Sequence, residues 1–273
     1  MIKRQSPEDP MVPIVDFVEE EYKPGGALNV ATNIKTLSKR GTTVYVSSIF
    51  SDFTILMLKQ KKLFYDEKVL SVKDEKKPHP RELIKTRIVN SETGKQLVRI
   101  DNREKFSESD LQRYKNKCYF NKFVDFDAIV VSDYNKGLVD EILIKNLSQV
   151  KCPVFIDTKK KDLSIWKDIP KCFIKINSKE FQNSQKAHEV KHLIVTEGDR
   201  GSAYYQEGVL DSYYKTDRVE DADVTGAGDV FLSAFAIAYL ENEPMDACLK
   251  FANRAALISV KKFGTSEVNR NEI

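Results

Sequence analysis

The second half of the chain contains four short apolar runs, and this repeated pattern constrains the fold more than any other feature of the sequence. The runs are rich in β-branched and aromatic residues, and helical stretches separate some of them. Alternation of buried strands with loops and helices is typical of a parallel sheet that is covered by helices on both faces. The predicted strands are residues 128–132, 154–157, 173–176 and 193–196.

A polar residue stands at the carboxyl end of each predicted strand. These residues are Asp133, Asp157, Asn177 and Thr196, and Asp157 could equally cap a helix. Ligands of open parallel sheets bind beyond this edge, so a ligand site is expected there. Because no Pro-, Gly- or Ser-rich linker interrupts the pattern, residues 1–273 are predicted to form a single domain.

The first part of the chain predicts two further strands and two helices. Residues 12–18 and 43–49 have strand character. Apolar residues recur with a helical period between residues 27 and 40, and Gly41 is a plausible helix cap. A second helix is expected over residues 53–62.

Residues 85–101 have the pattern of a β-hairpin. Two alternating runs, 86–89 and 96–100, flank the turn Ser91-Glu92-Thr93-Gly94. One polar and one apolar face would suit a small sheet that lies over a site. We therefore expect a β lid, with strands from about 10–24 and 84–102.

The run Asp223-Val224-Thr225-Gly226-Ala227-Gly228-Asp229 precedes an apolar helix and is the strongest chemical signal in the chain. A glycine-rich turn at a helix start presents free backbone N–H groups, which bind anions. A carboxylate there would compete with a phosphate for these donors, so it is better suited to accept a proton from a substrate hydroxyl. The alternative is an aspartate that merely caps the helix.

This run closely resembles the second signature of the PfkB/ribokinase carbohydrate kinases. The resemblance implies that Asp229 is the catalytic base and that the backbone of Gly226, Ala227 and Gly228 forms an anion hole. It also implies ATP and Mg²⁺ as cofactors. The implied fold is α/β, a ribokinase-like three-layer αβα sandwich with a mostly parallel central sheet and a small β lid.

Other segments resemble further motifs of the same family. Gly25-Gly26-Ala27-Leu28-Asn29 is similar to the first signature, in which Gly25, Gly26 and Asn29 would contact the sugar. Asn177-Ser178-Lys179-Glu180 resembles the NxxE motif, in which Asn177 and Glu180 would organise Mg²⁺ and phosphate through water. The residues that the resemblance places around the nucleotide are Thr196, Gly198, Gly201, Asn253 and Gly264.

Within the family, the D-glycero-β-D-manno-heptose 7-phosphate kinases show the strongest resemblance, through the runs SPEDP at 6–10 and SDYNKG at 132–137. The implied reaction transfers the γ-phosphoryl group of ATP to O1 of heptose 7-phosphate. A phosphorylated substrate needs cationic anchors. The candidate substrate residues are Lys85, Arg87 and Arg99 of the hairpin, and Asp133 and Lys136 of the run at 132–137. The two arginines share a face only if the hairpin register allows it.

The chain departs from the family pattern in three places. The usual first strand, with its GDxxxD-like run, is absent before Ser6, no glycine follows the strand around 43–49, and Thr158 stands where relatives commonly have proline. Bifunctional members continue into an adenylyltransferase domain, and we expect only the kinase half here. The alternatives are a kinase for another sugar or nucleoside and a kinase-like binding protein with impaired catalysis.

Composition limits the remaining possibilities. The 44 basic and 41 acidic residues leave a net charge of +3, which gives no reason to expect a nucleic-acid partner. The apolar run 230–240 is too short for a membrane span, and the first residues do not resemble a signal peptide. The four cysteines show no paired spacing, so reduced thiols in a cytoplasmic protein are expected. The family resemblance implies a homodimer formed through the lid.

Overall fold

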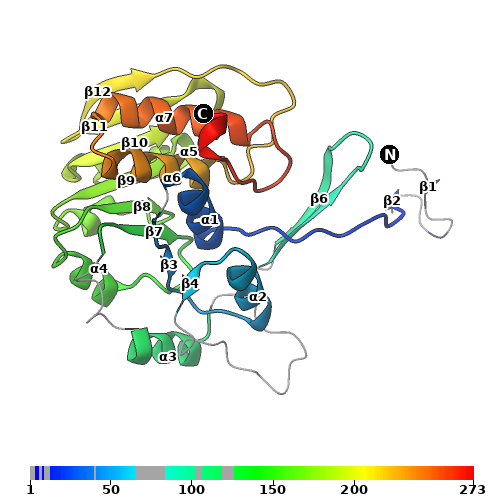
Figure 1. The fold of residues 1–273 in the computed structure, drawn as a ribbon, viewed down its shortest axis with the longest axis horizontal. Helices are drawn as coiled ribbons and strands as arrows, with labels where there is room; N and C mark the ends of the chain where they lie inside the picture. The colour runs from blue at the N-terminus through cyan, green and yellow to red at the C-terminus, as the bar shows by residue number, and fades with distance from the viewer. Residues whose placement is uncertain are drawn as a thin grey trace.

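The computed structural model describes residues 4–5, 8, 13–39, 41–65, 84–101, 106–118 and 126–273. At its centre lies a six-stranded sheet in the order β12-β11-β10-β9-β8-β7 (Figure 1). Strands β7 to β10 are parallel to one another, and β11 and β12 are antiparallel. The strands are β7 (Ile129–Asp133), β8 (Val154–Thr158), β9 (Cys172–Asn177), β10 (His192–Thr196), β11 (Ser202–Gln206) and β12 (Val209–Tyr214).

The four strands predicted from the apolar runs are confirmed, and their ends differ from the prediction by at most one residue. The hairpin of β11 and β12 was not predicted. Its turn contains Glu207 and Gly208, both with positive φ, and a turn of this kind between two β-rich runs is a recognisable hairpin signal. The hairpin extends the parallel sheet on one edge with antiparallel strands.

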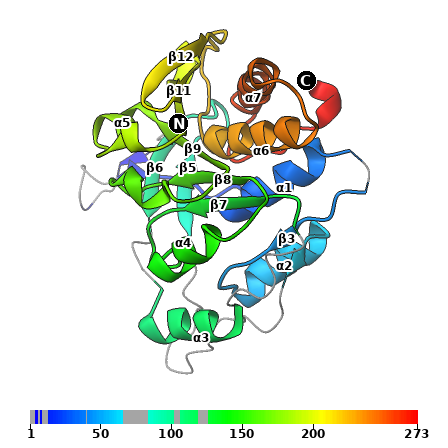
Figure 2. The same cartoon turned by 90° about the vertical axis from the view of Figure 1, so that its left-hand side faces the viewer.

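Helices cover both faces of this sheet, as Figure 2 shows. On one face lie α1 (Ala27–Leu37), α6 (Ala227–Leu240) and α7 (Met245–Ser259). On the other lie α4 (Glu141–Leu147), the short 3-10 helix η2 (Leu163–Trp166) and α5 (Ser178–Gln182). The predicted three-layer αβα architecture is confirmed. Helix α1 is shorter than predicted: it ends at Leu37 and its C-cap is Ser38, not Gly41.

Alternate residues of the strands enter two hydrophobic cores. Phe155 and Phe173 stack on each other with ring centroids 5.4 Å apart and pack against Phe235 of α6. Ile156 and the fully buried Trp166 belong to the core on the opposite face. Because both faces of the parallel strands are buried, their sequences are continuous apolar runs rather than alternating ones.

The first part of the chain forms a smaller layer beside β7. Strand β3 (Tyr45–Val46) pairs in parallel with β4 (Phe64–Tyr65), and α2 (Asp52–Gln60) packs next to them. The predicted strand at 43–49 and helix at 53–62 are thus present in shortened form. Helix α3 (Glu108–Cys118) follows the hairpin of residues 85–101 in the chain. Within the described residues, β7 is an edge strand of the central sheet, and β3 and β4 form a separate pair.

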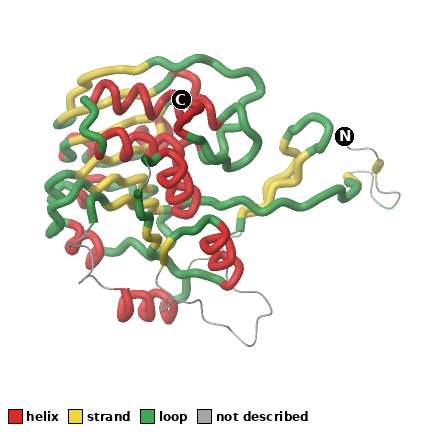
Figure 3. Tube along the Cα trace, viewed as in Figure 1, coloured by secondary structure: helices red, strands yellow, loops and turns green. Residues whose placement is uncertain are grey.

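A two-stranded arm extends from the body of the molecule (Figure 3). It consists of β5 (Lys85–Val89) and β6 (Gln96–Asp101), which confirms the predicted hairpin. At the end of the N-terminal segment, β1 (Arg4–Gln5) pairs with β2 (Pro13–Ile14). The predicted lid strand 10–24 is much shorter in the structure. Only β2 has strand structure, and residues 15–24 pair with no other strand. Residues 10–12 lie outside the described part.

Two expectations from composition, on membrane spans and on thiols, can be compared with the described residues. No helix among them combines the length and apolar character needed to cross a membrane. Cys152, Cys172 and Cys248 are free thiols. The described part of the chain also contains no cluster of three or more His, Cys, Asp or Glu side chains that could hold a metal ion.

Candidate active site

The turn before α6 is built by its glycines and by one aspartate. Gly226 has a φ of 78°, in the left-handed region that glycine adopts without strain, and it is the N-cap of α6. Asp223 fixes the turn from outside, because its carboxylate accepts hydrogen bonds from the backbone N–H of Thr225 at 2.9 Å and of Gly264 at 2.8 Å. The turn therefore has a fixed shape at the start of α6, the part of a helix whose backbone N–H groups can bind an anion.

Asp229 lies in the first turn of α6 and is almost fully buried. Its Oδ2 accepts a hydrogen bond from the side-chain amide of Asn29 at 2.9 Å, and the phenol of Tyr134 lies close enough to interact electrostatically with its carboxylate. Burial raises the pKa of Asp229 to about 6, although the Asn29 hydrogen bond and the Lys175 charge oppose this shift. A carboxylate whose pKa lies this close to neutrality is well suited to accept a proton.

The structure joins the two glycine-containing motifs that the sequence only places far apart. Asn29 belongs to α1, and its amide nitrogen would lie 2.8 Å from a Cβ atom added at Gly226. Gly26, at the start of α1, faces the ring of Tyr134, with a hypothetical Cβ atom 3.2 Å from Cε2 of that ring. Asn29 thus borders the carboxylate of Asp229, and Gly26 lies against the neighbouring ring of Tyr134, whereas nothing lies within 4 Å of a Cβ atom added at Gly25.

Sequence reasoning missed Tyr134 as a site residue. Its phenol contacts Asp229, and burial followed by the nearby carboxylates raises its pKa strongly. The ammonium groups of Lys85 and Lys159 lie 5.0 Å and 5.6 Å from its ring centroid, within the range of cation–π attraction. The run SDYNKG contained the signal, because a tyrosine that directly follows a parallel strand lies at the ligand-binding edge of the sheet.

A series of alternating charges continues from Asp229 along the same edge of the sheet. Lys175 of β9 donates to Oδ2 of Asp157 at 2.7 Å. Lys159 lies 3.7 Å from Oδ1 of Asp157 and also forms a hydrogen-bonded ion pair with Glu180. Lys175 and Lys159 were not predicted as site residues, because a single lysine within or after an apolar strand gives no distinctive sequence signal.

Asn177 and Glu180 form a capping box at the start of α5. The Asn177 side chain accepts from the Glu180 N–H, and Glu180 accepts from the Asn177 N–H, each at 2.9 Å. The NxxE spacing is therefore explained locally by helix capping. The same geometry directs the other oxygen of Glu180 toward Lys159 and the site.

The residues predicted to line the nucleotide are distributed over neighbouring segments. Thr196 ends β10, and Gly198 lies in the following turn with open space around its Cα. Gly201 has a structural reason for being glycine, since an added Cβ atom would lie 1.9 Å from the Tyr214 carbonyl oxygen. Asn253 of α7 is buried and donates to Ser202 at 2.8 Å. Gly264 is held next to Asp223, as described above.

The cationic residues of the arm share one face. Arg87 and Arg99 are direct cross-strand partners, and so are Lys85 and Asp101. Arg99 forms a two-point ion pair with Asp101, with both N–O distances at 2.9 Å. Like charges opposite each other destabilise a hairpin, and the ion pair with Asp101 offsets the charge of Arg99. Burial lowers the pKa of Lys85, and the charges of Arg99, Arg87 and Lys136 act in the same direction.

This cationic face looks toward the buried carboxylate, because Lys85 lies over the Tyr134 ring. Lys136 contributes to the electrostatic environment of Lys85 and so belongs to the same region. The carboxylate of Asp133 contacts the protein itself, since it accepts from the Thr158 hydroxyl at 3.0 Å and from the Asn135 N–H at 2.8 Å. Its predicted contact with the sugar stays a prediction.

Comparison with known proteins identifies the family. The profile described as pfkB family carbohydrate kinase matches residues 12–272, nearly the whole chain. The chain belongs to the pfkB family of carbohydrate kinases. It is accordingly a sugar kinase, and its substrate is a small molecule.

Curated relatives of this pfkB kinase include the bifunctional protein HldE of Vibrio cholerae serotype O1, with 28% identity over 289 residues. The HldE protein of Shewanella piezotolerans is 31% identical over 291 residues. Each alignment covers 99% of this chain and 58% of the relative, so the chain spans little more than half the length of these proteins.

Solved structures show the same fold. Ribokinase from Thermotoga maritima matches with a TM-score of 0.69 and 21% identity, covering 98% of this chain and 91% of that one. Phosphofructokinase-2 from Escherichia coli in complex with fructose-6-phosphate matches with a TM-score of 0.66 and 16% identity, covering 91% and 84%. Ribokinase-like architecture is thereby confirmed for this pfkB kinase.

Proposed function

We propose that this pfkB kinase transfers the γ-phosphoryl group of ATP to O1 of a heptose 7-phosphate, the D-glycero-D-manno isomer, to give the 1,7-bisphosphate. The observation that carries the proposal is the cationic face of the arm: Lys85 lies over the ring of Tyr134, and Arg87 and Arg99 follow it on the same face. A sugar that already bears a phosphate would place that anion against the arm and its free hydroxyl near the carboxylate. The resemblance to HldE proteins supports the heptose as the sugar.

The proton-transfer step falls to Asp229. Its ionised carboxylate would accept the proton of the O1 hydroxyl while the bond between that oxygen and the γ-phosphorus forms and the bond to ADP breaks. The hydrogen bond from Asn29 holds the carboxylate in place, and the phenol of Tyr134 lies beside it. The backbone of Gly226, Ala227 and Gly228 would stabilise the charge on the transferred group.

The nucleotide would lie along the segments that follow β10 and α7. Gly198 leaves room for a ligand, and Gly264 borders the turn at Asp223. Thr196, Gly201 and Asn253 shape the same region from β10, the start of β11 and α7. We assign ATP rather than another phosphoryl donor because the pfkB neighbours include an Arabidopsis thaliana ribokinase complexed with ribose and ATP, with a TM-score of 0.57 and 18% identity, covering 89% of this chain and 84% of that one.

The residues present fit a Mg²⁺ ion that is bound mainly by phosphate oxygens and water. Such an ion needs only one or two carboxylates, and the described residues offer no larger cluster. Asp157 fits this role because its Oδ1 is buried and accepts no hydrogen bond, and Glu180, which lies nearby, would act through water. When bound, the ion would neutralise negative charge on the phosphates.

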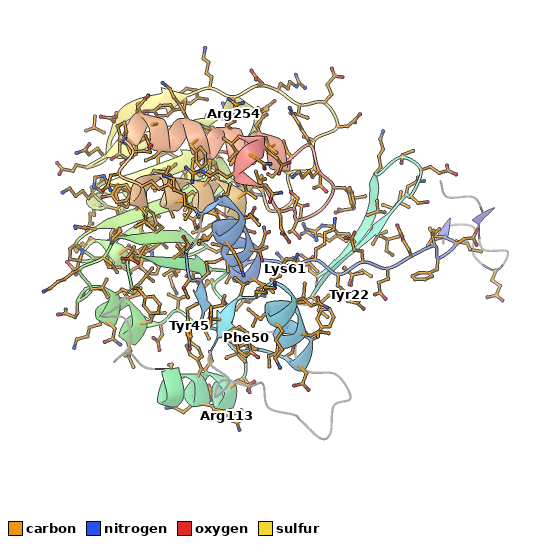
Figure 4. All side chains as sticks on the ribbon, in the orientation of Figure 1. Tyr22, Tyr45, Phe50, Lys61, Arg113 and Arg254 are labelled. Carbon is orange, nitrogen blue, oxygen red and sulfur yellow. The ribbon has the colours of Figure 1, made fainter. Side chains whose placement is uncertain are left out.

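Arg87→Ala is expected to raise the KM for heptose 7-phosphate by about tenfold to a hundredfold, since charge-assisted hydrogen bonds contribute on this scale. Turnover of unphosphorylated heptose should not change. Steady-state assays with ATP measure both quantities. Arg113→Ala is the matched control, because Arg113 is exposed on α3, away from the arm (Figure 4). An unchanged KM in the Arg87 variant would favour a different sugar or a nucleoside as the substrate.

The arm also supports the proposal that two copies of the chain associate through it. Opposite the cationic face lie Ile88, Val98 and Ile100, of which Val98 is 45% and Ile100 56% exposed. A two-stranded hairpin with an uncovered apolar face is marginally stable alone. A second copy of the arm would cover this face and leave the cationic face toward the site.

Ile100→Asp is therefore expected to convert a dimer into a monomer in sedimentation velocity experiments, because it places a charge in the proposed contact. Val209→Asp is the matched control, since Val209 is also an exposed apolar strand residue, 70% exposed, and lies on β12, far from the arm. A wild-type protein that sediments as a monomer would refute the association.

A further inference from the structure

The least expected charge in the molecule is Lys175. It lies within β9, which has β8 on one side and β10 on the other, and its side chain is only 5% exposed. The three residues before it in β9, Cys172 to Ile174, and the one after it, Ile176, are all apolar and buried. Lysine is almost never fully buried unless it has a partner, so its position calls for a specific reason.

Two contacts define where the ammonium group lies. It donates to Oδ2 of Asp157 at 2.7 Å, and this aspartate is its direct cross-strand partner on β8. On its other side it lies against the start of α6, because a Cβ atom added at Gly228 would be 2.4 Å from Nζ. Lys175 therefore lies directly beneath the anion-binding turn.

This arrangement is unfavourable for folding alone. The N-terminus of a helix carries partial positive charge, and a cation placed there is repelled. A buried ion pair is often no more stabilising than an apolar pair of similar volume. Natural sequences retain such locally unfavourable choices mainly at functional sites. An anion between the ammonium group and the N–H groups of the turn would satisfy both at once.

We infer that the ammonium group of Lys175 is a catalytic group of this kinase, which contacts the phosphoryl group during its transfer over the Gly226–Gly228 turn. The inference rests on the proposed phosphoryl transfer. Lys175 forms no covalent bond: the phosphorus–oxygen bond to ADP breaks, the bond to the sugar oxygen forms, and the hydroxyl proton passes to Asp229. Lys175 stabilises the charge on the equatorial oxygens, and Asp157 holds its ammonium group in position.

The test compares Lys175→Gln with the wild type, because glutamine can still donate a hydrogen bond to Asp157 but carries no charge. We expect kcat to fall by about a hundredfold or more, as for other oxyanion donors, while the KM for ATP stays within about threefold. Binding of ADP with Mg²⁺ and aluminium fluoride, which mimics the transferred group, should weaken at least tenfold, and binding of ADP alone should be unchanged. A purely structural ion pair would not produce this difference between the two ligands.

Lys250→Gln is the matched control, since it breaks an exposed lysine–aspartate pair with a 2.8 Å contact on α7. A Lys175→Gln variant with near-normal kcat, or with equal loss of both ligands, would overturn the inference. If the variant does not fold, ¹⁵N-lysine NMR of the wild type takes its place: one buried ammonium signal should shift with ADP and aluminium fluoride but not with ADP alone, and no such shift would overturn it. The ligand measurements need no sugar, so they remain informative if the wild type phosphorylates none.

Discussion

Replacing Asp229 by asparagine is expected to lower kcat by about 10²- to 10⁴-fold, the range typical for loss of a general base. The amide keeps the shape of the side chain and can still accept the hydrogen bond from Asn29, but it cannot take the hydroxyl proton. The affinity for ATP should change little, because the turn at Gly226 and the nucleotide segments are intact. Kinetic assays and equilibrium nucleotide binding measure the two effects separately. Full turnover in this variant would refute the role of Asp229 as the base.

The same substitution should not destabilise the protein. Burial raises the pKa of Asp229 from 3.8 to about 6, so the folded state favours the protonated form. The ionised group at neutral pH therefore opposes folding by roughly 3 kcal/mol, and this penalty shrinks as the pH falls below about 6 and is gone below pH 3.8, where the unfolded chain is protonated as well. A neutral asparagine should leave the melting temperature unchanged or raise it. Loss of activity together with a lower melting temperature would indicate a structural role instead.

The raised pKa also determines how the activity of the wild type should depend on pH. The base works only when it is ionised, so kcat/KM should be constant above about pH 6 and fall tenfold per pH unit below it. The phosphate of the substrate titrates in a similar range. Carboxylate ¹³C NMR, compared between the wild type and the Asp229→Asn variant, assigns the titration to the residue.

Gly226→Ala is expected to abolish most activity and to destabilise the fold. An alanine at this position must hold a φ of 78°, which costs about 1–3 kcal/mol. Its Cβ atom would lie 2.8 Å from the Asn29 amide and 3.1 Å from Thr265 Cγ2. Asn29 is fully buried and cannot move away freely, so its hydrogen bond to Asp229 should weaken. Thermal unfolding and kcat measure the two consequences.

Gly41→Ala separates backbone strain from damage to the site. Gly41 has a φ of 95°, but nothing lies within 4 Å of its hypothetical Cβ atom. We expect the control to lower the melting temperature by the strain alone and to keep its activity. Equal kinetic effects in both variants would show that the contact between Gly226 and Asn29 is unimportant for catalysis.

Much of the fold could be predicted because the buried strands leave a strong local signal. Strands β8 and β9 are apolar on both faces, and this pattern reveals a parallel sheet without any partner sequence. The segment 15–24 was predicted to continue a strand, but it forms no ladder, and Phe17 is 80% exposed. Its apolar residues have the pattern of a buried strand. Sequence periodicity, however, does not reveal whether a partner strand lies beside such a segment.

The candidate site could be predicted where its chemistry is local in sequence. The turn from Asp223 to Asp229 contains the glycines of the proposed anion site and the carboxylate of the proposed base in one run. The contacts that join Asp229 to Asn29, Tyr134 and Lys175 come from α1, the end of β7 and the middle of β9. These residues come together only when the strands and helices pack in the fold. The sequence therefore shows that the residues are present but not that they lie close together.

The most direct test of the account is to identify the product that the purified chain makes from ATP and D-glycero-D-manno-heptose 7-phosphate. ³¹P NMR should show ADP and, in equal amount, a sugar with a second phosphoryl group on its anomeric oxygen. The Asp229→Asn variant should form this product only at the residual rate given above. Absence of any phosphorylated product from heptose 7-phosphate, with transfer to an unphosphorylated sugar or with no transfer at all, would contradict the proposed function.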